Sequence, residues 1–281
     1  MNAVTRPSTA VDFVEEYAAA AERFAVAVAW ADPRALVPSC AGWTVSDLVV
    51  HLGNVHAWAA TIVETGLPAV EQNDHPRGSR SRTASQWYAG KAEDLYEVLR
   101  HADPEQPCWN FAFGTGVAGF WQRRQLHETT VHGFDLDLAT DRETAETDPV
   151  VAADGVDEVL TVFLHRMSQR GHVPELERPV LVSASDTGDA WLVSPQPRRE
   201  PPPLVPEQPS GPVEAASPRA PTVVRGRPAL ERSGAAVEAL SAPADVLYRL
   251  LWKRLPLEES GLVVEGDDAR VRAFLGSRLV P

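Results

Sequence analysis

Long stretches with helical periodicity dominate the chain up to Gly171, and this regularity constrains the fold more than any other feature of the sequence. Helices are expected over residues 11–30, 44–66, 85–101, 119–140 and 150–171. Thr44 and Asp47 have the spacing of a capping box, which would begin the second of these helices. Short links between amphipathic helices favour an up-and-down bundle, which we place at residues 1–172.

The pattern changes after Gly171. Two short apolar runs, PVLVSAS and AWLVS, flank a DTGD turn and predict a β-hairpin. Ten of the chain's 24 prolines lie between Pro195 and Pro221, so residues 195–222 are expected to form a proline-rich, disordered insertion. Strand and helix patterns then resume. We therefore expect residues 173–281 to be a small α+β domain.

The bulk properties exclude several classes of partner. A formal net charge of -13 argues against nucleic acid and anionic membranes, since both attract proteins rich in Lys and Arg. No apolar run approaches the roughly 20 residues of a membrane span, and the N-terminus lacks the pattern of a secretion signal. We therefore expect a cytoplasmic protein, in which Cys40 and Cys108 are free thiols.

The helical segment FWQRRQLHETTVHGFDLDLA carries the most informative polar residues. At about 100° per residue, Arg124, Glu128, His132 and Asp135 lie on one stripe beside its apolar face. Glu128 and His132 are four residues apart, so both side chains leave the same face and could converge on a metal ion. His127 faces the apolar side and could be a pocket acid or base, or a packing residue.

A third ligand could come from the helix over residues 44–66. His51 lies on the shoulder of its apolar face, and His56 is a rival on geometry. Ligands from His and Glu with one position left open are typical of catalytic rather than structural zinc, and Asp135 or Arg124 could orient them. Spacing alone leaves another interpretation open, in which the Glu–His pair is an ordinary surface pair and His51 a satisfied core histidine.

Two separated segments resemble the mycothiol-dependent maleylpyruvate isomerase family. VPSCAGWTVSDLVVHLGNVHAWA resembles that family's PGWT-V-x-D-L-x-x-H-L segment, and FWQRRQLHETTVHGFD resembles its R-x-x-x-E-x-x-x-H helix. The resemblance implies a DinB-like helical bundle in which His51, Glu128 and His132 hold the metal, and it selects His51 over His56. One departure is Ala41, where proline is usual before Gly-Trp.

The resemblance also suggests further site residues. The segment ADVLYRLLWKRLPLE resembles the family's sterol-carrier-like C-terminal domain, which makes Arg254 a candidate for binding substrate carboxylates. Arg124 and His127 are the other candidate catalytic residues. Trp43 and Trp121 are candidate cofactor contacts, although tryptophans are more often part of the core or of a pocket wall.

The resemblance implies mycothiol as the cofactor. A metal ion would activate it, because a metal-bound thiol loses its proton and becomes a nucleophile. Two reactions are expected alternatives: cis-trans isomerisation by reversible thiolate addition, with Arg124 or Arg254 offsetting enolate charge, and S-transfer to a small electrophile. A non-catalytic module with a structural metal and an apolar ligand is a third possibility, and metal-dependent hydrolysis a fourth. The expected partners are small molecules, for a monomer or homodimer.

Overall fold

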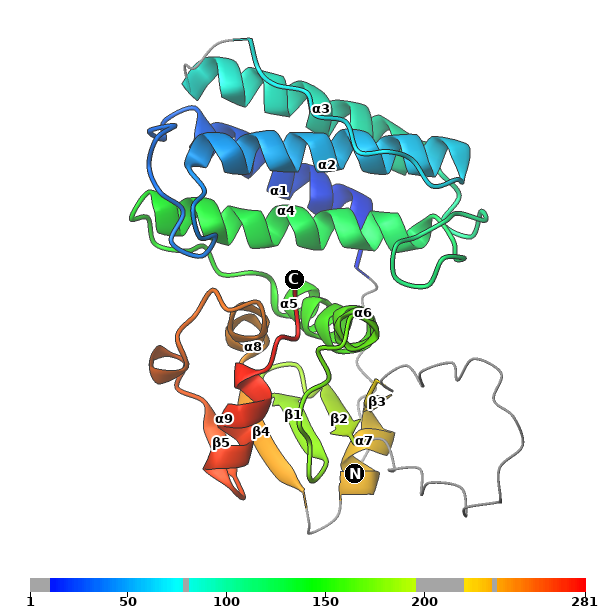
Figure 1. Ribbon diagram of the computed structural model, residues 1–281, viewed down its shortest axis with the longest axis vertical. Helices are drawn as coiled ribbons and strands as arrows, with labels where there is room; N and C mark the ends of the chain where they lie inside the picture. Colours follow the sequence, from blue (N-terminus) through cyan, green and yellow to red (C-terminus); the bar gives the residue numbers. More distant parts are fainter. Residues whose placement is uncertain (1–10, 78–80, 196–219, 234–236) are drawn as a thin grey trace, which may run out of the picture. The chain divides into compact units, whose positions relative to one another are not determined.

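The computed structural model describes residues 11–77, 81–195, 220–233 and 237–281. The chain divides into two compact units, residues 1–146 and 147–281. The predicted fold class is confirmed, because the first unit is a helical bundle and the second combines helices with a small mixed sheet (Figure 1). Almost all of the predicted disordered insertion, residues 195–222, lies outside the described residues.

The helices of the first unit begin and end at recognisable signals. They are α1 (Phe13–Val28), α2 (Val45–Thr65), α3 (Ser81–His101) and α4 (Gly119–Ala139). The predicted capping box begins α2, since Thr44 and Asp47 each accept a hydrogen bond from the other's backbone N–H. Gly66 ends α2 with a φ of 69°, in the left-handed region that glycine adopts without strain.

One long crossover connects α2 to α3, so these two helices run in the same direction (Figure 1). Ser81, the first residue of α3, donates to the carbonyl of Ala31 just beyond the end of α1. Gln106, beyond the end of α3, donates to the carbonyl of Val63 in the last turn of α2. The bundle therefore departs from the simple up-and-down order that short links favoured. Such a connection is possible because an extended chain covers about 3.3 Å per residue, whereas a helix rises about 1.5 Å per residue. A connection with fewer residues than α2 can therefore run back along the whole length of that helix.

Helix α4 buries an unusual set of polar side chains. Those buried are Gln122, Arg124, Gln125, His127, Thr129, His132 and Asp135. Buried polar groups need hydrogen-bond partners, and here they come both from α4 itself and from other segments of the bundle. Gln125 Oε1 lies 2.8 Å from Nδ1 of His56 on α2, whose Nε2 lies 3.1 Å from the hydroxyl of Tyr88 on α3. This network fixes α4 against its neighbours.

In the second unit, five strands form one sheet among the described residues, in the order β3-β2-β1-β4-β5. They are β1 (Val180–Ala184), β2 (Ala190–Ser194), β3 (Thr222–Arg225), β4 (Glu238–Ala242) and β5 (Val263–Glu265). The predicted hairpin is confirmed as β1 paired antiparallel with β2, while β1 pairs in parallel with β4. The α-helices described after β3 are α7 (Arg227–Ser233), α8 (Ala244–Leu251) and α9 (Asp268–Gly276).

The second unit begins at Thr147, whereas the sequence suggested a boundary after residue 172. The expected helix over 150–171 is α5 (Pro149–Glu158), a π-helical turn η1 (Val159–Phe163) and α6 (Leu164–Gln169). Helix α5 is tied to the second unit by close packing, because a Cβ at Gly155 would lie 2.4 Å from the ring of Tyr248 on α8. Periodicity identified this helix, but it carries no information about which core the helix joins.

Among the described residues, none of the helices combines the length and the hydropathy needed to span a bilayer.

Candidate metal centre

Three predicted ligands from two helices converge in the first unit. Nε2 of His51 on α2 lies 3.4 Å from Oε1 of Glu128 on α4, and Nε2 of His132 lies 3.2 Å from the same oxygen. One ligand atom from each residue lies within 4.8 Å of the other two. Glu128 and His132 share a face because they are one helical turn apart. We call His51, Glu128 and His132 the triad.

The triad fits a small divalent cation. Zn–N and Zn–O bonds are about 2.0 to 2.2 Å long, so two ligand atoms on a tetrahedral ion lie about 3.3 Å apart. The two nitrogen-to-oxygen distances in the triad, 3.4 and 3.2 Å, match this spacing. Within the described ranges, no other trio of His, Cys, Asp or Glu side chains converges in this way. Three protein ligands leave a coordination position for a small molecule.

Arg124 keeps the central ligand ionised. Its Nη2 lies 2.8 Å from Oε2 of Glu128, and its side chain is 2% exposed. Burial alone would raise the pKa of Glu128, but Arg124 and the two histidines outweigh it and hold that pKa well below its usual range. Because Oε2 is taken by Arg124, Oε1 is the oxygen that faces both histidines.

Asp135 orients the second histidine. Its Oδ2 lies 2.8 Å from Nδ1 of His132, so Nε2 is the ring nitrogen that faces Glu128. Burial alone would lower the pKa of His132, but its bonds to Asp135 and Glu128 outweigh it and raise that pKa to about 9. In the metal-free protein the imidazole of His132 is therefore protonated and donates to both carboxylates, and a metal ion at Nε2 would have to displace the proton there.

Trp43, a candidate cofactor contact, lies beside the triad. Its ring centroid is 4.9 Å from that of His51 and 6.4 Å from that of His132, with an angle of 24° between the planes of Trp43 and His132. The indole is only partly buried. Trp43 therefore forms one wall of the candidate centre.

The comparisons agree with this picture. The family model described as Mycothiol maleylpyruvate isomerase N-terminal domain matches residues 9–137. The match lies within the first unit. The matched range holds all three triad residues, together with Trp43 and Asp135.

Two similar solved structures extend the fold match along the chain. The crystal structure of the mycothiol-dependent maleylpyruvate isomerase has a TM-score of 0.55 at 10% identity, and that of a histidine-to-alanine mutant of it 0.56 at 9%. In both cases the match covers 90% of this chain and 91% of the other. At this identity the similarity establishes the fold alone. No functionally curated protein has a significant sequence match to the chain.

Other candidate residues of this domain lie away from the triad. Trp121 is fully buried, donates from Nε1 to the carbonyl of Trp109, and packs edge-to-face on Trp58. It belongs to the core and presents no surface to a cofactor. His56, the rival ligand, is held in the α4 network, and burial lowers its pKa to about 4. His127 is buried on α4 outside the triad.

Arg254 lies in the second unit, on the turn that follows α8. Its Nη1 donates to the carbonyl of Trp252 over 2.6 Å, and its guanidinium carbon lies 5.9 Å from the centroid of that indole. The side chain is partly exposed. Its assignment to substrate carboxylates stays a prediction.

Sequence reasoning missed two residues on the loop before α2. Ser39 Oγ donates to Oδ1 of Asp135, and Sγ of Cys40 lies 3.5 Å from Oδ2. The one feature of the sequence that could have indicated them is their place directly before the AGWT segment. Periodicity could not reveal a contact between residues so far apart in the chain.

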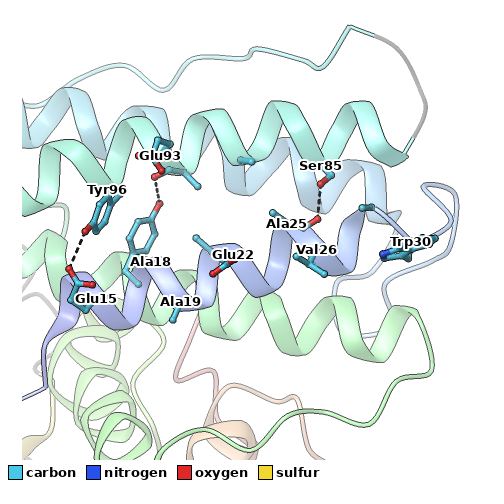
Figure 2. A pocket seen from close by; sticks show the side chains of 15 residues that line it. Glu15, Ala18, Ala19, Glu22, Ala25, Val26, Trp30, Ser85, Glu93 and Tyr96 are labelled. Atoms are coloured by element: carbon cyan, nitrogen blue, oxygen red, sulfur yellow. Dashed lines mark hydrogen bonds between the residues drawn. The ribbon is translucent and has the colours of Figure 1, made fainter.

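A groove between α1 and α3 offers a different kind of surface (Figure 2). Alanines of both helices line it, with Glu15, Glu22 and Glu93 along its length and Trp30 at one end. It contains no histidine or cysteine and none of the triad. Of these two places, only the triad brings together side chains that could hold a metal ion.

Proposed function

We propose that this chain is an enzyme that holds one divalent metal ion, zinc, through His51, Glu128 and His132, and that uses mycothiol as its thiol cofactor. The observation that carries the proposal is the convergence of the three ligand atoms in a unit that matches the mycothiol maleylpyruvate isomerase N-terminal domain. Zinc bound there would lower the pKa of a coordinated thiol enough to make it a thiolate at neutral pH.

The chain's own side chains prepare the site for this chemistry. Arg124 keeps Glu128 ionised from one side. Asp135 holds Nδ1 of His132, which leaves Nε2 for the metal. Trp43 packs on the ring of His51 and would supply an apolar surface for the thiol cofactor.

The reaction that we propose is cis-trans isomerisation of a small unsaturated carboxylic acid, as the names of both similar structures suggest. Arg254 is the proposed partner of the substrate carboxylates, since a guanidinium matches a carboxylate bidentately. His127 is the proposed proton donor or acceptor. S-transfer to an electrophile would use the same metal site and is distinguished by its product.

The first test compares the wild-type protein with His51→Ala, Glu128→Gln and His132→Ala. His101→Ala is the matched control, because His101 is exposed and pairs with Glu97 at the end of α3. Elemental analysis should find about one zinc per chain in the wild type and the control, and little in the triad variants. Calorimetry should detect mycothiol binding to the zinc-loaded forms alone. Zinc retained by all three triad variants would overturn the site.

The second test follows maleylpyruvate with and without mycothiol. Release of the trans isomer with the thiol unchanged supports the isomerase. A stable thioether product would instead identify an S-transferase, and hydrolytic cleavage of the substrate without thiol would identify a hydrolase. Zinc binding with neither mycothiol binding nor turnover would favour a binding module with a structural metal.

A further inference from the structure

The loop between α1 and α2 reaches the candidate metal centre at two points. Ser39 Oγ donates to Oδ1 of Asp135, which lies on α4 behind His132. Trp43 of the same loop packs on the ring of His51, which lies on α2. One short loop therefore contacts both halves of a site whose ligands come from two helices.

The loop has a fixed shape. The N–H of Cys40 donates to the carbonyl of Val37, that of Trp43 to the carbonyl of Cys40, and that of Val37 to the carbonyl of Trp43, over 3.1, 3.0 and 2.9 Å. Gly42 has a φ of +83°, which a side chain would disfavour. Val37 anchors the turn at 2% exposure. The hydroxyl of Ser39 is thus presented to Asp135 from a rigid turn.

Asp135 needs such a donor to keep one orientation. The side chain is fully buried, and a buried carboxylate requires hydrogen bonds. The torsion that turns an aspartate carboxyl group is soft and roughly two-fold, so packing alone fixes it poorly. Ser39 holds Oδ1, which leaves Oδ2 at 2.8 Å from Nδ1 of His132. Cys40 adds little, since a thiol is a weak donor.

The orientation of Asp135 decides what His132 offers the metal. Imidazole ligates through one nitrogen only when the other carries the proton, and the bond from Nδ1 to Asp135 selects that form. It also aims Nε2 at the oxygen of Glu128, 3.2 Å away. If the carboxyl group turned, both the tautomer and the ring direction would be less well defined.

We propose that Ser39 is a positioning residue for the metal site: its hydroxyl fixes the carboxyl plane of Asp135 and thereby sets the direction of His132. The inference rests on the proposed function, in which the triad binds zinc. It adds a residue outside the triad, on a different segment of the chain, that sets how tightly the ion is held. The direct effect falls on metal affinity.

The test measures zinc affinity of the full chain by competition with a chromophoric chelator. Ser39→Ala should weaken zinc binding about tenfold, the lower end of the loss found for residues that support a metal ligand. Ser39→Thr keeps the hydroxyl and should stay within about twofold of the wild type. Ser85→Ala is the matched control, because Ser85 Oγ also donates to a distant segment of the bundle, at the carbonyl of Ala25. It should leave zinc affinity unchanged.

A second measurement separates positioning from loss of stability. The chemical shifts of Nδ1 of His132 and of its proton in the zinc-loaded protein report the strength of the hydrogen bond to Asp135. They should move towards the values of a weaker hydrogen bond in Ser39→Ala and stay in place in the other two variants. A purely structural role would lower the melting temperature without changing these shifts.

The outcomes are distinct. Wild-type zinc affinity and unchanged His132 shifts in Ser39→Ala would overturn the inference while leaving the proposed function intact. Failure of the wild-type chain to bind zinc would overturn both. If Ser39→Ala does not fold, Ser39→Cys decides, because it keeps the volume and donates weakly. Equal zinc affinities for Ser39→Cys and Ser39→Thr would then refute the positioning role.

Discussion

Arg124 and Glu128, one helical turn apart on α4, form an ion pair in which Nη2 lies 2.8 Å from Oε2. Because of this pair, the two carboxylate oxygens of Glu128 have different partners. Oε2 is held by the guanidinium, and Oε1 faces the ring nitrogens of His51 and His132. The oxygen that faces the two histidines is therefore selected by an arginine that lies outside the triad.

Replacing Arg124 with methionine should weaken zinc binding. The change removes the charge while keeping an unbranched side chain. The pKa of Glu128 should rise, because burial raises it and the guanidinium no longer opposes that effect. We expect zinc affinity to fall about 10- to 100-fold, measured by chelator competition at pH 7. Arg23→Met, at an exposed position of α1, is the control, and equal affinities in the two variants would contradict the role of Arg124.

Zinc affinity should also depend steeply on pH. In the metal-free protein the pKa of His132 is raised to about 9, so His132 is protonated at neutral pH and zinc must displace that proton. Affinity should rise about tenfold per pH unit through the neutral range and level off above pH 9. Calorimetry in buffers of different ionisation enthalpy should record about one proton released per zinc bound at pH 7.5. A flat profile would mean that His132 is already neutral before the metal arrives.

The sequence was most informative where the contacts are local. Glu128 and His132 are one turn apart, so helical periodicity alone places them together. The capping box of Thr44 and Asp47 spans three residues and is confirmed for the same reason. His51 needed the family resemblance, because periodicity left His56 equally possible.

Contacts between distant segments were out of reach. Ser39 and Asp135 are 96 positions apart, and no local pattern relates them. Trp121 was an expected cofactor contact, but its burial depends on Trp58 and Trp109 from two other segments. The boundary between the units could not be predicted for the same reason. Helix α5 belongs to the second unit because it packs on α8, which lies far from it in the sequence.

His56 should make the folded protein sensitive to acid. Burial lowers its pKa to about 4, whereas an unfolded chain has a histidine pKa of about 6.5. Between these values the unfolded state binds the extra proton, so this contribution to stability is full above about pH 6.5 and is lost as pH falls towards 4. The loss should be on the order of 3 kcal/mol, measured by urea unfolding from pH 7 to pH 4.

The variant His56→Gln isolates this effect. It removes the titrating ring from the network with Gln125 and Tyr88, so stability at pH 7 should fall while its decline towards acid becomes shallower. His101→Gln, at an exposed position, should keep the wild-type slope. An unchanged slope in His56→Gln would assign the acid sensitivity to other groups.

Gly155 tests the packing that joins α5 to the second unit. Alanine normally stabilises an exposed helical position by up to about 1 kcal/mol relative to glycine. At Gly155 an added Cβ would lie 2.4 to 2.7 Å from the ring of Tyr248, which is fully buried and cannot move aside. Gly155→Ala should therefore destabilise the protein by about 1 to 3 kcal/mol. Gly90→Ala is the control, because a Cβ there meets nothing within 4 Å and should be neutral or stabilising. Thermal unfolding would measure both, and a stabilising Gly155→Ala would show that α5 is not packed on α8.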